Sequence, residues 1–152
     1  MFTVISFKAL DMSTYVYISS NASKQYFPAN ESTHFRMTLA KPLSLYGDWE
    51  VALTEINLPK LAQGYKPEYI AIECSFCIDS FVNGGQDQLL DRFFLSELRP
   101  SDVIRLTRPH YVKVNTDLLH TLQLNLYDET HAKPSFQSGN LHCTLHLRRC
   151  LE

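Results

Sequence analysis

The cysteines are the first residues whose types and spacing suggest chemistry. Cys74 and Cys77 have the C-x-x-C spacing that is found in zinc sites and redox pairs. A zinc site commonly needs a second pair at a matching spacing, and Cys143 with Cys150 does not provide one. If the segment is a strand, positions three apart point to opposite faces, so the two thiols would not share an ion. We therefore interpret all four cysteines as reduced, structural thiols.

Histidines and carboxylates are the second group of candidates. His142 and His146 are four residues apart, a spacing that places two metal ligands on one face of a helix. On a strand the same spacing separates them by about 13 Å, which is too far for one ion. Glu50 and Glu55 flank an apolar stretch, where we expect structural pairing rather than acid–base catalysis.

Short catalytic and nucleotide-binding motifs are absent from the sequence. It contains no G-x-S-x-G elbow and no H-E-x-x-H motif, and no phosphate-loop pattern surrounds Gly84-Gly85. A catalytic triad assembled from distant positions would leave no local signature, but nothing in the sequence favours one. The sequence therefore predicts a protein that is not an enzyme and that has no cofactor and no metal site.

Composition and charge narrow the range of partners. The chain has 152 residues, of which 45% are hydrophobic and 20% charged, and its net charge is −2. This length supports one domain with a core that needs no metal or disulfide. Nucleic-acid binders usually carry a cationic excess, and a spanning helix needs about 18 apolar residues. Residues 1–10 also lack the pattern of a signal peptide. We expect neither nucleic-acid recognition nor membrane association. We expect the protein to assemble inside a cell.

Alternating apolar and polar residues predict an all-β chain, since this period places one set of side chains on each face of a strand. The predicted strands are 13–19, 34–45, 49–57, 69–79, 88–95, 102–107, 111–114 with 118–127, and 141–149. Gly47-Asp48 and Asn83-Gly84-Gly85 are turn signals. Many short strands separated by turns indicate a sandwich or barrel. Only 88–95 fits a helix equally well, because Leu89, Leu90, Phe93, Phe94 and Leu98 also have helical spacing.

The same alternation predicts which side chains face the core. The expected inward residues are Ile70, Ile72, Cys74, Phe76 and Ile78 in one strand, Leu122, Leu124 and Leu126 in another, and Leu141, Cys143, Leu145 and Leu147 in the last.

Two blocks of the sequence carry a resemblance to a known family. The first runs from Tyr15-Val16-Tyr17-Ile18 through Tyr26-Phe27-Pro28 and Lys41-Pro42-Leu43 to Gly47-Asp48-Trp49-Glu50-Val51. It resembles the N-terminal half of the minor capsid (penton) proteins of Polinton/Maverick elements and adintoviruses. Those proteins combine a tyrosine-phenylalanine-proline segment, a lysine-proline-leucine run and a glycine-aspartate-tryptophan-glutamate-valine strand.

The second block lies toward the other end of the chain. It comprises Arg108-Pro109-His110-Tyr111, Phe136-Gln137-Ser138-Gly139 and Thr144-Leu145-His146-Leu147-Arg148. The family ends its domain with a similar strand, in which threonine-leucine-histidine is followed by an aromatic residue and arginine. This chain departs from that pattern at Leu147, where an aromatic residue is usual, and at His131, where a glycine often follows an aspartate turn. The middle segment, 61–81, is also shorter and less typical than the corresponding segment in the family.

The resemblance implies a single jelly-roll sandwich over residues 1–152. Two four-stranded antiparallel sheets would have the strand orders B-I-D-G and C-H-E-F, with 1–13 as an N-terminal arm and 150–152 as a tail. The resemblance also shifts 88–95 toward a strand. The residues that carry the family motif are Gly47, Asp48, Trp49, Glu50, Pro109, Tyr111, Gly139, His146 and Arg148. We interpret them as structural, with Trp49 in the core and the charged side chains solvated or locally paired.

The functional implication of the resemblance is assembly rather than catalysis. Such a chain would form a homopentamer at the vertices of a viral capsid, beside a major capsid protein with a double jelly roll. It would belong to the virion and would assemble inside the host cell, with the nucleus as one site. The alternatives are a β-sandwich binding module that does not assemble and a host-domesticated copy of the viral gene. A metal-dependent jelly-roll enzyme is a third, less favoured class, because the sequence shows no inward-facing histidine cluster.

Overall fold

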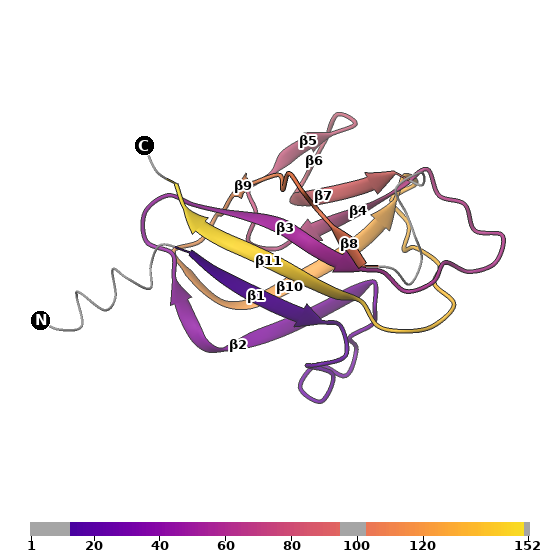
Figure 1. The fold of residues 1–152 in the computed structure, drawn as a ribbon, viewed down its shortest axis with the longest axis horizontal. Helices are drawn as coiled ribbons and strands as arrows, with labels where there is room; N and C mark the ends of the chain where they lie inside the picture. Colours follow the sequence, from indigo (N-terminus) through magenta and orange to yellow (C-terminus); the bar gives the residue numbers. More distant parts are fainter. Residues whose placement is uncertain (1–12, 95–102, 151–152) are drawn as a thin grey trace, which may run out of the picture.

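The computed structural model describes residues 13–94 and 103–150, which form two antiparallel sheets packed face to face (Figure 1). The first sheet contains β1 (Ser13–Ser19), β11 (His142–Arg149), β3 (Trp49–Asn57) and β8 (Val103–Arg105) in that order, and β9 (Val112–Lys113) also pairs with β3. The second contains β2 (His34–Ser44), β10 (Leu118–Asp128), β4 (Tyr69–Cys74) and β7 (Leu89–Phe94). A separate hairpin is formed by β5 (Ser80–Val82) and β6 (Gly85–Asp87).

These strand orders are those of a jelly roll. Lettered along the chain, β1, β11, β3 and β8 with β9 occupy the positions B, I, D and G, because β8 and β9 pair with successive parts of β3. The second sheet gives C, H, E and F, and the β5–β6 hairpin is inserted between E and F. The expected fold class, an all-β single jelly roll with two antiparallel sheets, is confirmed.

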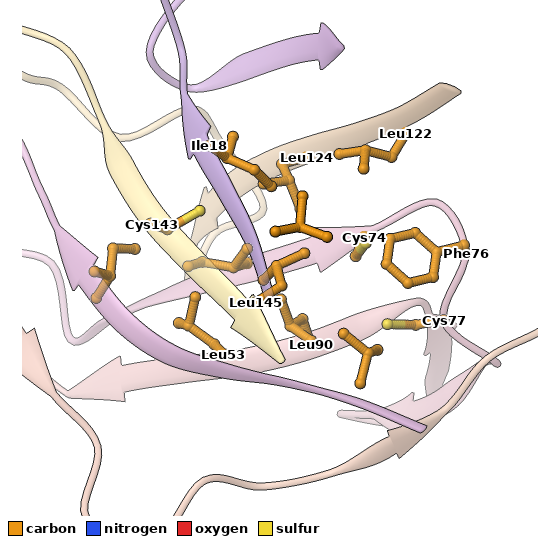
Figure 2. Close-up of a cluster of buried hydrophobic side chains, with 14 of the residues drawn as sticks. Ile18, Leu53, Cys74, Phe76, Cys77, Leu90, Leu122, Leu124, Cys143 and Leu145 are labelled. Atoms are coloured by element: carbon orange, nitrogen blue, oxygen red, sulfur yellow. The ribbon is translucent and has the colours of Figure 1, made fainter. Parts of the chain in front are cut away.

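The core lies between the two sheets and is built mainly from the predicted inward residues. Figure 2 shows Ile18, Leu53 and Leu145 from the first sheet meeting Leu124 and Leu90 from the second, and all five are buried. Each fully buried aliphatic side chain stabilises the fold by about 1.5–3 kcal/mol relative to an exposed one. The core therefore holds the two sheets in a fixed relation and fixes which side chains each presents outward.

The prediction for 69–79 is wrong in its second half. Strand β4 ends at Cys74, and a tight turn follows in which the Cys77 amide donates to the Cys74 carbonyl at 3.1 Å. The turn reverses the alternation, so Cys77 is buried beside Cys74 while Ile78, predicted to face inward, is 41% exposed. The amide groups of Gln88 and Asn115 both donate to the Cys77 carbonyl, which stabilises the chain outside the sheet.

A β-bulge explains why the sequence of β7 has helical spacing although the segment is a strand. Glu73 pairs with Leu89 and Ile72 pairs with Asp91, so Leu90 is an extra residue in β7. The extra residue changes the alternation, and Leu90 and Phe93, three positions apart, both enter the core.

Some sequence expectations fall on residues that the structure does not describe. They are residues 1–12 of the expected arm, residue 95 at the end of the predicted strand 88–95, Leu98, residue 102 and positions 151–152 of the tail. Across the part of the chain that is described, no helix has the length and apolar character needed to cross a membrane.

Candidate functional site

Several residues of the family motif meet on the outer side of the first sheet. In β11 the core-facing leucines alternate with outward-facing residues, and two of these are His146 and Arg148. The register pairs His146 with Tyr15 of β1, and Arg148 with Glu50 of β3. Together with two further tyrosines they form what we call the network face: Tyr15, Tyr17, Glu50, Tyr111, His146 and Arg148.

Arg148 is the charged centre of the network face. Its Nε lies 2.6 Å from Oε1 of Glu50, and its guanidinium carbon lies 3.4 Å from the ring centroid of Tyr111. The hydrogen bond that Arg148 donates to Glu50 raises the pKa of Arg148 above its usual value. An ion pair on one side and an aromatic ring on the other fix the planar guanidinium in one orientation.

His146 links this ion pair to the tyrosines. The Tyr111 hydroxyl and Nδ1 of His146 are 2.8 Å apart, and the imidazole stacks on Tyr15 with ring centroids 4.5 Å apart. Burial, with a smaller effect of the Arg148 charge, lowers the pKa of His146. The imidazole is therefore uncharged at neutral pH and acts as a flat, hydrogen-bonded spacer between its neighbours.

The network ends in two exposed tyrosines on β1, which is an edge strand of its sheet. Tyr15 is 53% exposed and Tyr17 is 75% exposed, and their rings stack at 6.4 Å. Exposed tyrosines held by neighbouring rings lose little conformational entropy on contact, and tyrosine and arginine are enriched in protein interfaces. The arrangement has the chemistry of a protein-contact surface.

The motif residues at positions 47–49 lie in the core or in the turn before β3. Trp49 is in the core, and its indole nitrogen donates to the Tyr46 carbonyl at 3.1 Å. Gly47 has a φ of +94°, and a Cβ there would lie 3.0 Å from Nη2 of Arg149, so this turn requires glycine. The Asp48 carbonyl accepts the Cys150 amide at 2.8 Å, which ties the turn to the end of β11. This turn sets the start of β3 and hence the position of Glu50.

Pro109 and Gly139 are not brought into the network face. Pro109 lies two residues before Tyr111 in the segment between β8 and β9. Gly139 lies between β10 and β11 with a φ of +110°, and a Cβ there would lie 3.7 Å from Cβ of Pro59.

The cysteines are not placed as nucleophiles. Cys74, Cys77 and Cys143 are buried and carry no disulfide. Burial raises the pKa of Cys143 to about 12. Burial also raises the pKa of Cys74, and the neighbouring Cys77 raises it further. Thiols in this environment stay protonated and unreactive at neutral pH. Cys150 is less buried, and its Sγ lies 3.1 Å from Nζ of Lys113.

Sequence reasoning missed two features of the outer surface. The stacking of Tyr15 on His146 depends on the register between β1 and β11, for which a single sequence carries no signal. A second group, Glu73, Asp87 and His131, comes together on the other sheet from three separate segments.

Comparison with solved structures places this fold beside a viral capsid protein. The structure is similar to the crystal structure of selenomethionine-labelled mavirus penton protein, with a TM-score of 0.59 and 5% sequence identity. The match covers 91% of this chain and 100% of that chain. No protein-family model matches the chain, and no curated protein matches its sequence. The fold of this chain therefore resembles that of a viral penton protein over 91% of the chain.

Proposed function

We propose that this protein is a penton-like capsid subunit that acts by assembly. The observation that carries the proposal is the structural match, in which the full mavirus penton chain superposes on 91% of this jelly roll. The sequence resemblance to the minor capsid proteins of Polinton/Maverick elements and adintoviruses supports the same function. In this proposal five copies close around a five-fold axis beside a double-jelly-roll major capsid protein, and the protein resides in the virion.

We assign the network face to the contact with a neighbouring copy. Closure of a ring requires each subunit to present two different surfaces to its two neighbours. The network face suits one of them, because its Glu50–Arg148 pair is already neutralised and its outermost groups are the rings of Tyr15 and Tyr17. A partner can cover the Glu50–Arg148 pair without leaving either of these two charges buried and unpaired.

The oligomeric mass of the purified chain tests the assembly proposal. Light scattering over a range of concentrations should show a species of five 17.5 kDa chains, about 88 kDa. A stable trimer would contradict the proposal. So would a monomer that persists at all concentrations and in the presence of the major capsid protein, which is the behaviour expected of a binding module that does not assemble.

Matched tyrosine substitutions test the contact surface. Tyr17 and Tyr26 are exposed to almost the same extent, at 75% and 74%, but only Tyr17 belongs to the network face. Tyr17→Ser should shift the monomer–oligomer equilibrium toward the monomer, whereas Tyr26→Ser should leave it unchanged. Both variants should unfold within about 0.5 kcal/mol of the parent chain, as surface substitutions usually do. Equal effects of the two on assembly would place the contact elsewhere.

A further inference from the structure

A cluster of carboxylates and imidazole lies on the opposite side of the molecule from the network face. Glu73 is on the outer side of β4, Asp87 ends the hairpin strand β6, and His131 is in the turn after β10. One ligand atom from each lies within 4.8 Å of those of the other two. All three line a cavity of about 230 Å³ between the hairpin and the outer face of β4.

The two carboxylates in this cluster lack a cationic partner. No ion pair among the described residues includes Glu73 or Asp87, and no lysine or arginine lines the cavity. Apart from His131, the described lining of the cavity has no basic group to offset the two carboxylates, so a bound cation would be attracted to it.

His131 is held in place for this cluster at a conformational cost. Its φ is +63°, in the left-handed region that residues other than glycine seldom adopt. The turn is fixed by Asp128, whose carbonyl accepts the His131 amide at 2.9 Å. The imidazole then stacks on Tyr127 with ring centroids 4.2 Å apart and planes inclined by 11°. The ring is thus oriented before any ligand binds, and glycine at this position would be less strained but would supply no ligand atom.

We propose that Glu73, Asp87 and His131 form a binding site for one divalent cation of the first transition row, with zinc as the test ion. One imidazole nitrogen with two carboxylate oxygens is a ligand set that zinc accepts, whereas calcium prefers oxygen ligands alone. Around zinc, ligand atoms at about 2.1 Å from the ion stand roughly 3.4 Å apart. In this proposal the two carboxylate side chains rotate toward the imidazole to reach that spacing, and water completes the coordination.

The bound ion would add a link between the β5–β6 hairpin and the second sheet, in which β4 and β10 are already joined by strand pairing. The β5–β6 hairpin pairs only within itself among the described strands, and Asn83 Nδ2 reaches the Tyr69 hydroxyl at 3.3 Å. Figure 1 shows this hairpin projecting beyond β7 at the margin of the sandwich. An ion held by Asp87 would fasten the hairpin to β4 and to the turn after β10. The site is independent of whether the chain assembles.

Calorimetric titration of the metal-stripped, tag-free chain with zinc chloride tests the proposal. We expect one zinc ion per chain, with a melting temperature that rises with zinc concentration. Asp87→Asn and His131→Gly should each weaken binding by at least about tenfold, the scale on which perturbing a metal site acts. His131→Gly should also raise the melting temperature of the metal-free protein, since it relieves the left-handed backbone, so loss of binding in this variant is not loss of folding.

Two control variants separate this site from adventitious binding. His120→Asn removes an exposed histidine on β10, and Glu129→Gln changes another carboxylate of the same cavity. Both should bind zinc within twofold of the parent chain. The proposal is overturned by the absence of saturable binding, by unchanged binding in Asp87→Asn and His131→Gly, or by a loss in His120→Asn equal to that in His131→Gly.

Discussion

The network face and the Glu73–Asp87–His131 cluster differ in whether their carboxylates are paired with a basic side chain. On the network face, Glu50 and Arg148 are paired at 2.6 Å, and Tyr111 and His146 lie beside them. On the other sheet, Glu73 and Asp87 lie close together, and no basic side chain among the described residues pairs with them. The two surfaces are carried by the same jelly roll, so the fold does not cause the difference.

The difference indicates two kinds of external partner. A surface whose charges are already satisfied can be covered by another protein at little electrostatic cost, because no ion must be desolvated alone. A surface with two unpaired carboxylates and an oriented imidazole gains most from a small cation. We therefore connect the network face with protein contact and the Glu73–Asp87–His131 cluster with metal binding.

The largest expected effect concerns the core that both surfaces share. Leu145 of β11 is fully buried between the sheets, so Leu145→Ala should lower the free energy of unfolding by about 2–5 kcal/mol. Leu118 is 60% exposed, and Leu118→Ala should change the free energy of unfolding by less than about 0.5 kcal/mol. Urea denaturation measures both. Similar losses in the two variants would mean that the packing between the sheets is not what holds the surfaces in place.

The sharpest test of the comparison is the same substitution on each surface. Glu50→Gln removes the ion pair with Arg148 and should lower stability by up to about 1 kcal/mol, since the pair is partly exposed to solvent. Glu73→Gln removes repulsion from Asp87 and should raise stability by about 0.5 kcal/mol in metal-free protein. Denaturation curves at neutral pH should therefore move in opposite directions, and shifts of the same sign would contradict the comparison.

The pH dependence of the Glu73→Gln effect provides a control. The folded-state pKa of Glu73 is raised, so the folded protein favours the protonated carboxyl. The stability that this preference contributes is fully present below the pKa of Glu73 in the unfolded chain. It is lost as pH rises through the pKa of Glu73 in the folded chain. The gain from Glu73→Gln should therefore be largest at neutral pH and should disappear near pH 4. A gain that is the same at both pH values would have a cause other than charge.

The sequence predicted most of the fold because its strands alternate cleanly. The range 49–57 was predicted with the bounds that β3 has, and Leu141, Cys143, Leu145 and Leu147 are all buried as expected. The failures occur where the alternation is interrupted. The turn after Cys74 and the bulge at Leu90 both depend on contacts with other strands. The turn at Asn83-Gly84 was predicted, but the short strands on either side of it were not.

The sites were less predictable than the fold because they depend on pairing between distant segments. The resemblance singled out Glu50, Tyr111, His146 and Arg148, but their contacts follow from the register of β11 with β3. No sequence pattern joins Glu73, Asp87 and His131, because a strand, a hairpin and a turn each contribute one residue. The notable signal was His131 itself, which stands where the family often has a glycine.

An effect of similar size is expected when one hydrogen bond is removed from the network face. Tyr111→Phe keeps the ring beneath Arg148 but loses the contact between the hydroxyl and His146 Nδ1. Stability should fall by about 0.5–1.5 kcal/mol, the usual range for one hydrogen bond, while Tyr26→Phe should have no measurable effect. A nuclear magnetic resonance titration should also show an altered pKa of His146 in Tyr111→Phe, and an unchanged value would mean that the hydroxyl does not reach the imidazole in solution.

The smallest expected effect is the acid sensitivity of the network face. The groups that face the imidazole of His146 among the described residues are Tyr15, Tyr111 and the Arg148 guanidinium. Because burial and Arg148 lower the folded-state pKa of His146, its stabilising contribution is present above the unfolded value of 6.5 and is lost as pH falls through the folded value. His34 on the other sheet also has a pKa lowered by burial, so the parent chain contains two acid-sensitive histidines. Thermal melts at several pH values should show that His146→Asn loses less stability than the parent chain between neutral pH and about pH 5, with His34→Asn as the matched comparison. If His146→Asn has the same pH profile as the parent chain, the acid sensitivity does not come from His146 and belongs to the other sheet. The two surfaces would then not differ electrostatically at His146.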